Sequence, residues 1–123
     1  MTIIEKPWGH EEIWATSEKY VGKILYIKKG HRLSLQYHVI KEETIRVLKG
    51  TLYLHHRPVQ NYILGDASMQ IDVLKVGESF HIVPEAIHRF EAKDGDVTLV
   101  EVSTPELDDV VRLSDDYNRE NEN

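Results

Sequence analysis

Short runs of alternating apolar and polar residues, separated by turn residues, cover most of this chain. Apolar side chains at every second position are typical of β-strands with one buried face, and no stretch keeps the 3.6-residue period of an amphipathic helix. Breaks fall at Gly30, Gly50, Gly77 and Asp94–Gly95, and the last of these predicts a tight hairpin. Strands are expected at residues 12–15, 20–27, 33–39, 44–48, 51–55, 69–73, 79–83, 88–92 and 97–102. This pattern favours an all-β sandwich or barrel.

The C-terminal region follows a different pattern. Pro105–Leu113 is expected to form a short helical or irregular segment, and residues 118–123 have nothing apolar to bury, so we expect a mobile tail there. A chain of 123 residues has room for one hydrophobic core. The prediction is therefore a single domain over residues 1–117.

Composition narrows the classes of function. The chain has no cysteine, so disulfides and thiolate metal sites are excluded and any metal must use nitrogen and oxygen ligands. Its formal net charge of −6 disfavours nucleic acid as a partner. The N-terminus lacks the pattern of a signal peptide, and no apolar run is long enough to span a bilayer. We therefore expect a cytoplasmic protein that does not associate with membranes.

The first candidate ligands lie close together in the sequence. Gln36 and His38 are two residues apart, which places both side chains on the same face of a strand. A turn at Lys41-Glu42 would let a second strand begin near Glu43. On that strand Glu43 has the same phase as Ile45, in an apolar row that faces inward. The carboxylate is thus expected inside the fold.

The last candidate ligand comes much later in the chain. After Pro84 a new strand places His88 in phase with Phe90. Each of the four residues alone is better explained as a packed or solvated side chain, as is expected for His10, His31, His55, His56 and His81. Together, two imidazoles, one carboxylate and one amide oxygen suit a single divalent ion such as Zn, Mn, Fe, Co or Ni.

At these positions the chain resembles the cupin superfamily. Its first motif is matched by Gly30, Gln36, His38, Glu43 and Gly50, with glutamine in place of the first histidine, and its second by Gly77, Pro84 and His88. The resemblance implies a jelly-roll β-barrel, with Gln36, His38, Glu43 and His88 as metal ligands. Cupins commonly pair, so a homodimer is expected.

Within the cupins, the chain looks like a stand-alone type II phosphomannose isomerase domain. The resemblance rests on Leu33-Ser34-Leu35-Gln36-Tyr37-His38 with Glu43, on Lys6-Pro7-Trp8-Gly9, on His88-Arg89-Phe90-Glu91 and on parts of residues 101–119. Asp109-Val110-Val111-Arg112 is also similar to a stretch of type I phosphomannose isomerases in which an arginine serves the active site. This likeness implies a catalytic role for Arg112.

The leading hypothesis is a metal-dependent aldose–ketose isomerase that acts on a sugar or sugar phosphate through an enediolate, with mannose 6-phosphate as the first substrate to test. The sequence does not identify the base, and Glu12 and Glu85 are named for that role without a specific signal. A second hypothesis is a non-catalytic sugar- or metal-binding cupin in polysaccharide biosynthesis. It is motivated by departures from the family at Lys41, Thr44, Ala92 and Asn118. A cupin metal oxygenase comes third, and Gln36 counts against it because such enzymes favour histidine-rich sites.

Overall fold

The structure is a computed structural model that describes residues 2–57 and 69–118. These residues form two antiparallel sheets and no helix, so none of them belongs to a helix that could cross a membrane. In order across the first sheet, the strands are β1 (Thr2–Lys6), β2 (Gly9–Thr16), β3 (Val21–Ile27), β11 (Val97–Ser103), β6 (Glu43–Lys49) and β9 (Ser79–Ile82). In order across the second sheet, they are β12 (Val111–Ser114), β5 (Leu35–Tyr37), β10 (Ile87–Ala92), β7 (Leu52–Arg57) and β8 (Gln70–Leu74), and β4 (His31–Arg32) also pairs with β10.

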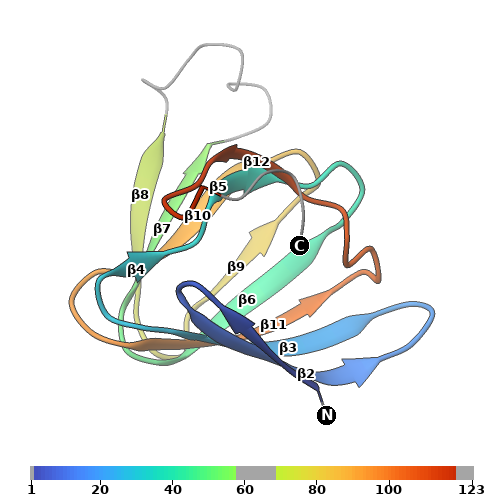
Figure 1. The fold of residues 1–123 in the computed structure, drawn as a ribbon, viewed down its shortest axis with the longest axis horizontal. Coiled ribbons are helices and arrows are strands. Elements are labelled where there is room, and N and C mark those ends of the chain that lie inside the picture. Colours follow the sequence, from blue (N-terminus) through green and yellow to red (C-terminus); the bar gives the residue numbers. More distant parts are fainter. Residues whose placement is uncertain (1, 58–68, 119–123) are drawn as a thin grey trace.

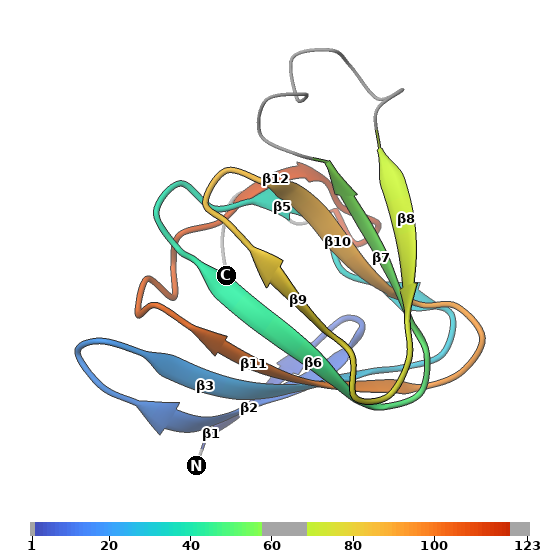
Figure 2. The same ribbon diagram turned by 180° about the vertical axis from the view of Figure 1, so that it is seen from behind.

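The chain crosses repeatedly between the two sheets. It passes from β3 in the first sheet to β4 and β5 in the second and returns to β6, and β9, β10, β11 and β12 then alternate between the sheets. Strands far apart in sequence therefore lie side by side, as β11 does between β3 and β6 (Figure 1). The reverse view shows β6 and β9 facing β10 and β7 across the interior (Figure 2). The prediction of an all-β jelly roll is confirmed.

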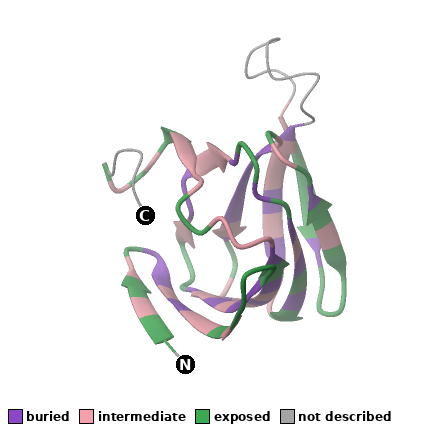
Figure 3. Ribbon diagram, turned by 90° about the vertical axis from the view of Figure 1, so that its right-hand side faces the viewer, coloured by how far each residue is buried: buried purple, intermediate pink, exposed green. Residues whose placement is uncertain are grey.

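The core lies between the two sheets. Ile45 in β6, Leu99 in β11 and Leu25 in β3 point inward, and Leu54 and Phe90 face them from the second sheet; all five are at most 2% exposed. Along β6 and β11, buried positions alternate with half-buried or exposed ones, as the period of two requires, and Figure 3 shows the buried positions gathered on the strands of the two sheets. Full burial of a leucine or phenylalanine side chain contributes about 1.5–3 kcal/mol, so this inward row stabilises the contact between the sheets.

Gly50 ends β6 in a conformation that suits glycine. Its φ of +84° lies in the left-handed region, and a Cβ atom there would come within 2.2 Å of the Asp96 carbonyl oxygen. The turn therefore accepts no larger residue without a backbone shift. It brings the chain directly from β6 in the first sheet to β7 in the second.

Two local predictions need correction, and one strand was missed. Asp94–Gly95 does not close a hairpin, because β10 and β11 belong to different sheets and this turn connects them. The segment expected to be helical or irregular is irregular from Pro105 to Val110, in agreement with the second alternative, but Val111–Ser114 forms a strand that pairs with β5. The strand Thr2–Lys6 was also not predicted. Of the predicted tail, residues 119–123 lie outside the described part of the chain.

Candidate metal centre

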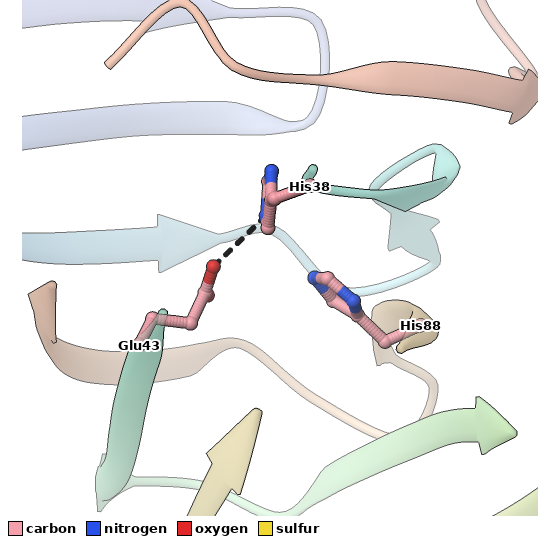
Figure 4. Close-up of side chains that lie close together, drawn as sticks. All are labelled: His38, Glu43 and His88. Carbon is pink, nitrogen blue, oxygen red and sulfur yellow. Dashed lines mark ion pairs between the residues drawn. The ribbon is translucent and has the colours of Figure 1, made fainter. Parts of the chain in front are cut away.

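Three buried side chains converge inside the fold. His38 follows the end of β5, Glu43 begins β6 and His88 lies in β10. One ligand atom from each residue lies within 4.8 Å of those from the other two, and the residues are at most 4% exposed. Figure 4 shows them pointing toward a common centre from three separate elements. The structure therefore brings together three of the four residues that were predicted as ligands.

Hydrogen bonds to main-chain carbonyl groups orient both imidazoles. The Nδ1 atom of His38 lies 2.6 Å from the Asp109 carbonyl oxygen, and that of His88 lies 2.9 Å from the Ala86 carbonyl oxygen. A carbonyl oxygen only accepts, so each Nδ1 must carry the proton and donate it. In the neutral rings, Nε2 then presents a lone pair to the centre. This second hydrogen bond is typical of metal-binding histidines.

The atoms that face the centre are left without hydrogen bonds among the described residues. They are Nε2 of His38, Nε2 of His88 and Oε2 of Glu43. The Oε2 atom of Glu43 lies 2.9 Å from Nε2 of His38, and with the His38 proton on Nδ1 both atoms present lone pairs that repel each other at this distance. Buried polar atoms without partners are rare and destabilising. A cation bound by all three would satisfy them together.

Protonation states in the cluster also fit a cation. Burial alone would raise the pKa of Glu43, but the neighbouring His38, Lys41 and His88 outweigh it and hold that pKa well below its usual range. Burial lowers the pKa of His88 to about 4, although the Glu43 carboxylate opposes the shift. At neutral pH the site thus offers a carboxylate and a neutral imidazole, the forms that bind metals. His38, Glu43 and His88 could hold a metal ion.

A row of buried charges runs from Glu43 across the first sheet. Lys41 Nζ lies 3.7 Å from Glu43 Oε2 and 3.3 Å from Glu101 Oε2, and Lys23 Nζ lies 3.3 Å from Glu11 Oε1. Burial alone would lower the pKa of Lys41, but Glu101 and Glu43 outweigh it and raise that pKa above its ordinary value. Burial raises the pKa of Glu101 and Glu43 adds to the rise, against the attraction of Lys41 and Lys23. Positive and negative groups therefore alternate beside the candidate metal ligands.

This row of buried charges was not predicted from the sequence, although the phase of the strands indicates it. Lys23 shares the inward phase of Leu25, and Glu101 shares that of Leu99. The same argument had placed Glu43 inside the fold. Charged residues in phase with buried apolar rows are costly unless they are paired, so they were candidates for a buried network.

A pocket of about 310 Å³ opens beside the cluster. Gln36, His38 and Lys41 are the lining residues nearest to the cluster. The charged or polar residues that complete its lining are Lys6, Glu11, Lys23, Asp108 and Arg112, and the apolar ones include Trp8, Ile13 and Leu33. Neither Glu12 nor Glu85 lines it, and Glu85 lies exposed in a turn with φ of +69°. A small polar molecule would fit this space.

Gln36 and Arg112 are the two other residues for which the sequence predicts a role in the site. In the second sheet Gln36 is directly opposite both His88 and Arg112, so the three side chains share the inner face. The Oε1 atom of Gln36 accepts a hydrogen bond of 2.6 Å from the Ser34 hydroxyl group. Whether Gln36 completes the ligand set, and whether Arg112 acts in catalysis, stay predictions.

The other histidines contact partners away from the cluster. These partners are aromatic or carboxylate groups: Tyr26 for His10, Tyr117 for His31, Glu91 for His55, Asp72 for His56 and Glu42 for His81. His56 is opposite His88 in register, but its Nε2 lies 3.0 Å from Asp72. These contacts agree with the packed or solvated roles expected for them.

Known proteins share this fold and the sequence pattern. A family model described as mannose-6-phosphate isomerase C-terminal matches residues 2–115, whereas no curated protein matches significantly. The solved structure of KdgF from Halomonas sp. has a TM-score of 0.70 at 13% identity, over 85% of this chain and 86% of that one. An RmlC-like cupin from Shewanella frigidimarina NCIMB 400 has a TM-score of 0.69 at 16% identity, over 85% and 83%.

A longer protein also contains the fold. The capsular polysaccharide assembling protein CapF from Staphylococcus aureus has a TM-score of 0.75 at 16% identity, over 92% of this chain but 32% of CapF. Identities this low show a common fold and nothing finer. The family model, in contrast, spans almost the whole chain. The chain therefore belongs to the mannose-6-phosphate isomerase C-terminal family and has the cupin fold.

Proposed function

We propose that this protein is a metal-dependent aldose–ketose isomerase whose substrate is a small sugar phosphate, with mannose 6-phosphate and fructose 6-phosphate as the first pair. The observation that carries the proposal is the convergence of three buried candidate ligand atoms that have no hydrogen bonds among the described residues, beside a pocket with several basic side chains. Membership of the mannose-6-phosphate isomerase C-terminal family supports the reaction class.

The residues of the cluster would hold one divalent ion of Zn, Mn, Fe, Co or Ni. His38, Glu43 and His88 supply two neutral nitrogens and one anionic oxygen, and Gln36 is the proposed fourth ligand. With a single anionic ligand the site keeps a net positive charge. When bound, such an ion supplies Lewis acidity toward a carbonyl or hydroxyl oxygen of the substrate.

The pocket suits an anionic substrate. Its lining includes four basic residues, Lys6, Lys23, Lys41 and Arg112, against two acidic ones, Glu11 and Asp108, although the whole chain has a net charge of −6. Basic groups in the lining favour a phosphate or carboxylate group there, although Lys23 and Lys41 also pair with buried carboxylates. We assign Arg112 to the phosphate or to an oxygen that gains charge during the reaction, because its planar guanidinium suits either.

The isomerisation moves a proton between C1 and C2 of the sugar and needs no oxidant or reductant. A carboxylate in the pocket can carry that proton if it reaches the substrate. Glu11 and Asp108 line the pocket, so they replace Glu12 and Glu85 as candidate bases. Glu11 is the more buried of the two.

The direct test is turnover. Purified protein, stripped of metal and reloaded with each of the five ions in turn, should convert mannose 6-phosphate to fructose 6-phosphate in a coupled assay. The variant His88→Ala should lose this activity, while His81→Ala, whose side chain is 53% exposed outside the pocket, should keep it. Lack of conversion with every metal would exclude this substrate pair.

A second candidate function is binding without turnover, in polysaccharide biosynthesis. The likeness to the capsular polysaccharide assembling protein CapF, over 92% of this chain, favours it. In that case calorimetry would show metal-dependent binding of a sugar phosphate while the coupled assay shows no product. Binding together with turnover would favour the isomerase.

A further inference from the structure

The connection between β11 and β12 runs against the turn that carries two of the candidate ligands. That turn, residues 38–43, begins with His38 and ends with Glu43. At one end of the contact, the Glu42 N–H donates to the Thr104 hydroxyl oxygen at 3.0 Å, and the Thr104 N–H donates to the Glu42 carbonyl oxygen at 3.0 Å. The connection is therefore tied to the turn next to Glu43.

At the other end, a single residue holds four consecutive positions of the turn. The Asp109 carboxylate accepts hydrogen bonds from the N–H groups of Val39 at 3.0 Å, Ile40 at 2.6 Å and Lys41 at 2.8 Å. Its main-chain carbonyl accepts the Nδ1 proton of His38 at 2.6 Å. Asp109 thus fixes both the path of the backbone after His38 and the orientation of the His38 ring.

We propose that Asp109 is a positioning residue for the metal centre, which holds His38 and the following turn in the conformation that binds the ion. The reasoning is that a metal-binding imidazole loses affinity when its second hydrogen bond or its backbone support is disturbed, by about 10–100-fold in comparable sites. The bond from His38 goes to a main-chain carbonyl, which no side-chain substitution removes. The carboxylate, however, sets where that carbonyl lies relative to the turn, because it binds the three N–H groups that follow His38.

A role confined to folding makes a different prediction. If Asp109 only ties two loops together, its loss destabilises the protein but leaves the affinity of the folded molecules for metal unchanged. If it positions His38, the affinity falls as well. Asp96 provides a matched control, since its carboxylate accepts a hydrogen bond of 2.8 Å from the Lys29 N–H in a turn outside the pocket lining.

The experiment compares Asp109→Asn and Asp109→Ala with Asp96→Asn in the full chain. Zn²⁺ affinity is measured by competition with a chelator of known affinity, and the tautomer of His38 by ¹⁵N NMR of the imidazole. We expect the Asp109 variants to bind Zn²⁺ about 10–100-fold more weakly and to lose the single Nδ1–H form of His38. Asp96→Asn should stay within about twofold of the wild type.

Wild-type affinity in the Asp109→Asn variant, within the same twofold range, would overturn the proposal. A measurement on the unsubstituted protein decides the matter if both Asp109 variants fail to fold. Positioning implies that Zn²⁺ and the turn stabilise each other, so Zn²⁺ should slow hydrogen exchange at the Ile40 and Lys41 amides more than at the Lys29 amide. Equal effects at the three amides would also refute it.

Discussion

Replacing Lys41 with methionine should destabilise the metal-free protein strongly. Lys41 is 6% exposed and lies between two buried carboxylates, with Nζ 3.3 Å from Glu101 and 3.7 Å from Glu43. Methionine keeps most of the apolar stem but removes the charge. Both carboxylates would then remain in the interior without their shared cation.

The size of the effect follows from these distances. At an effective dielectric constant of about 20, the two contacts attract by about 5 and about 4.5 kcal/mol. The cost of burying the ammonium group offsets part of this. Removing one partner of a buried pair costs about 3–5 kcal/mol in comparable cases, and we expect a loss in that range. With a urea slope of about 1.5 kcal/mol/M, the unfolding midpoint should fall by about 2–3 M.

Urea unfolding followed by circular dichroism measures this loss, and two further variants control it. Lys49→Met, at an exposed position in β6, should change stability by less than about 0.5 kcal/mol. The double variant Lys41→Met with Glu101→Gln should recover part of the loss, because one of the two unpaired charges is gone. If Lys41→Met costs less than about 1 kcal/mol, the charged row does not form as described.

Three further predictions concern pH, the core and the surface. Folding lowers the pKa of His88 from 6.5 to about 4, so His88 favours the folded, metal-free protein fully above pH 6.5. As the pH falls to 4, the free energy of unfolding should drop by up to about 3 kcal/mol. Urea unfolding at several pH values should show that His88→Asn reduces this loss. Leu99→Ala should cost about 2–5 kcal/mol, whereas Val102→Ala, exposed in the same strand, should cost under about 0.5; equal losses would contradict the assigned inward face. Arg32, through its hydrogen bonds, lowers the pKa of Asp116, so Arg32→Gln should raise that pKa toward 3.8 in an NMR titration and cost under about 1 kcal/mol, because the pair is solvent-exposed.

Local alternation was enough to predict the fold class and the burial of Glu43 and His88. The phase of Glu43 with Ile45, and of His88 with Phe90, placed both side chains inside, and the structure buries all four residues. A period of two is a local property of a strand, so it survives without knowledge of the partner strands. The phase of a side chain within its strand does not show which strands meet. The spacing of the cupin-like motif residues supplied that information.

Features that depend on tertiary pairing were not predictable in the same way. Val111–Ser114 is short and pairs only with β5 among the described strands, so its strand conformation comes from its neighbour rather than from its own pattern. The turn at Asp94–Gly95 has the composition of a hairpin, yet the strands on either side join different sheets. The contacts of Asp109 span about 70 residues of sequence. The homodimer and the cytoplasmic location stay predictions.

Metal binding by the three converging side chains tests the account most directly. Protein stripped with a chelator should take up one Zn²⁺ or Co²⁺ ion per chain in a calorimetric titration. The double variant His38→Ala with His88→Ala should bind more weakly by more than the roughly 100-fold that loss of a supporting hydrogen bond costs, while His81→Ala binds as the wild type does. Absence of stoichiometric binding, or equal binding by the double variant, would contradict the assignment of His38, Glu43 and His88 as a metal centre.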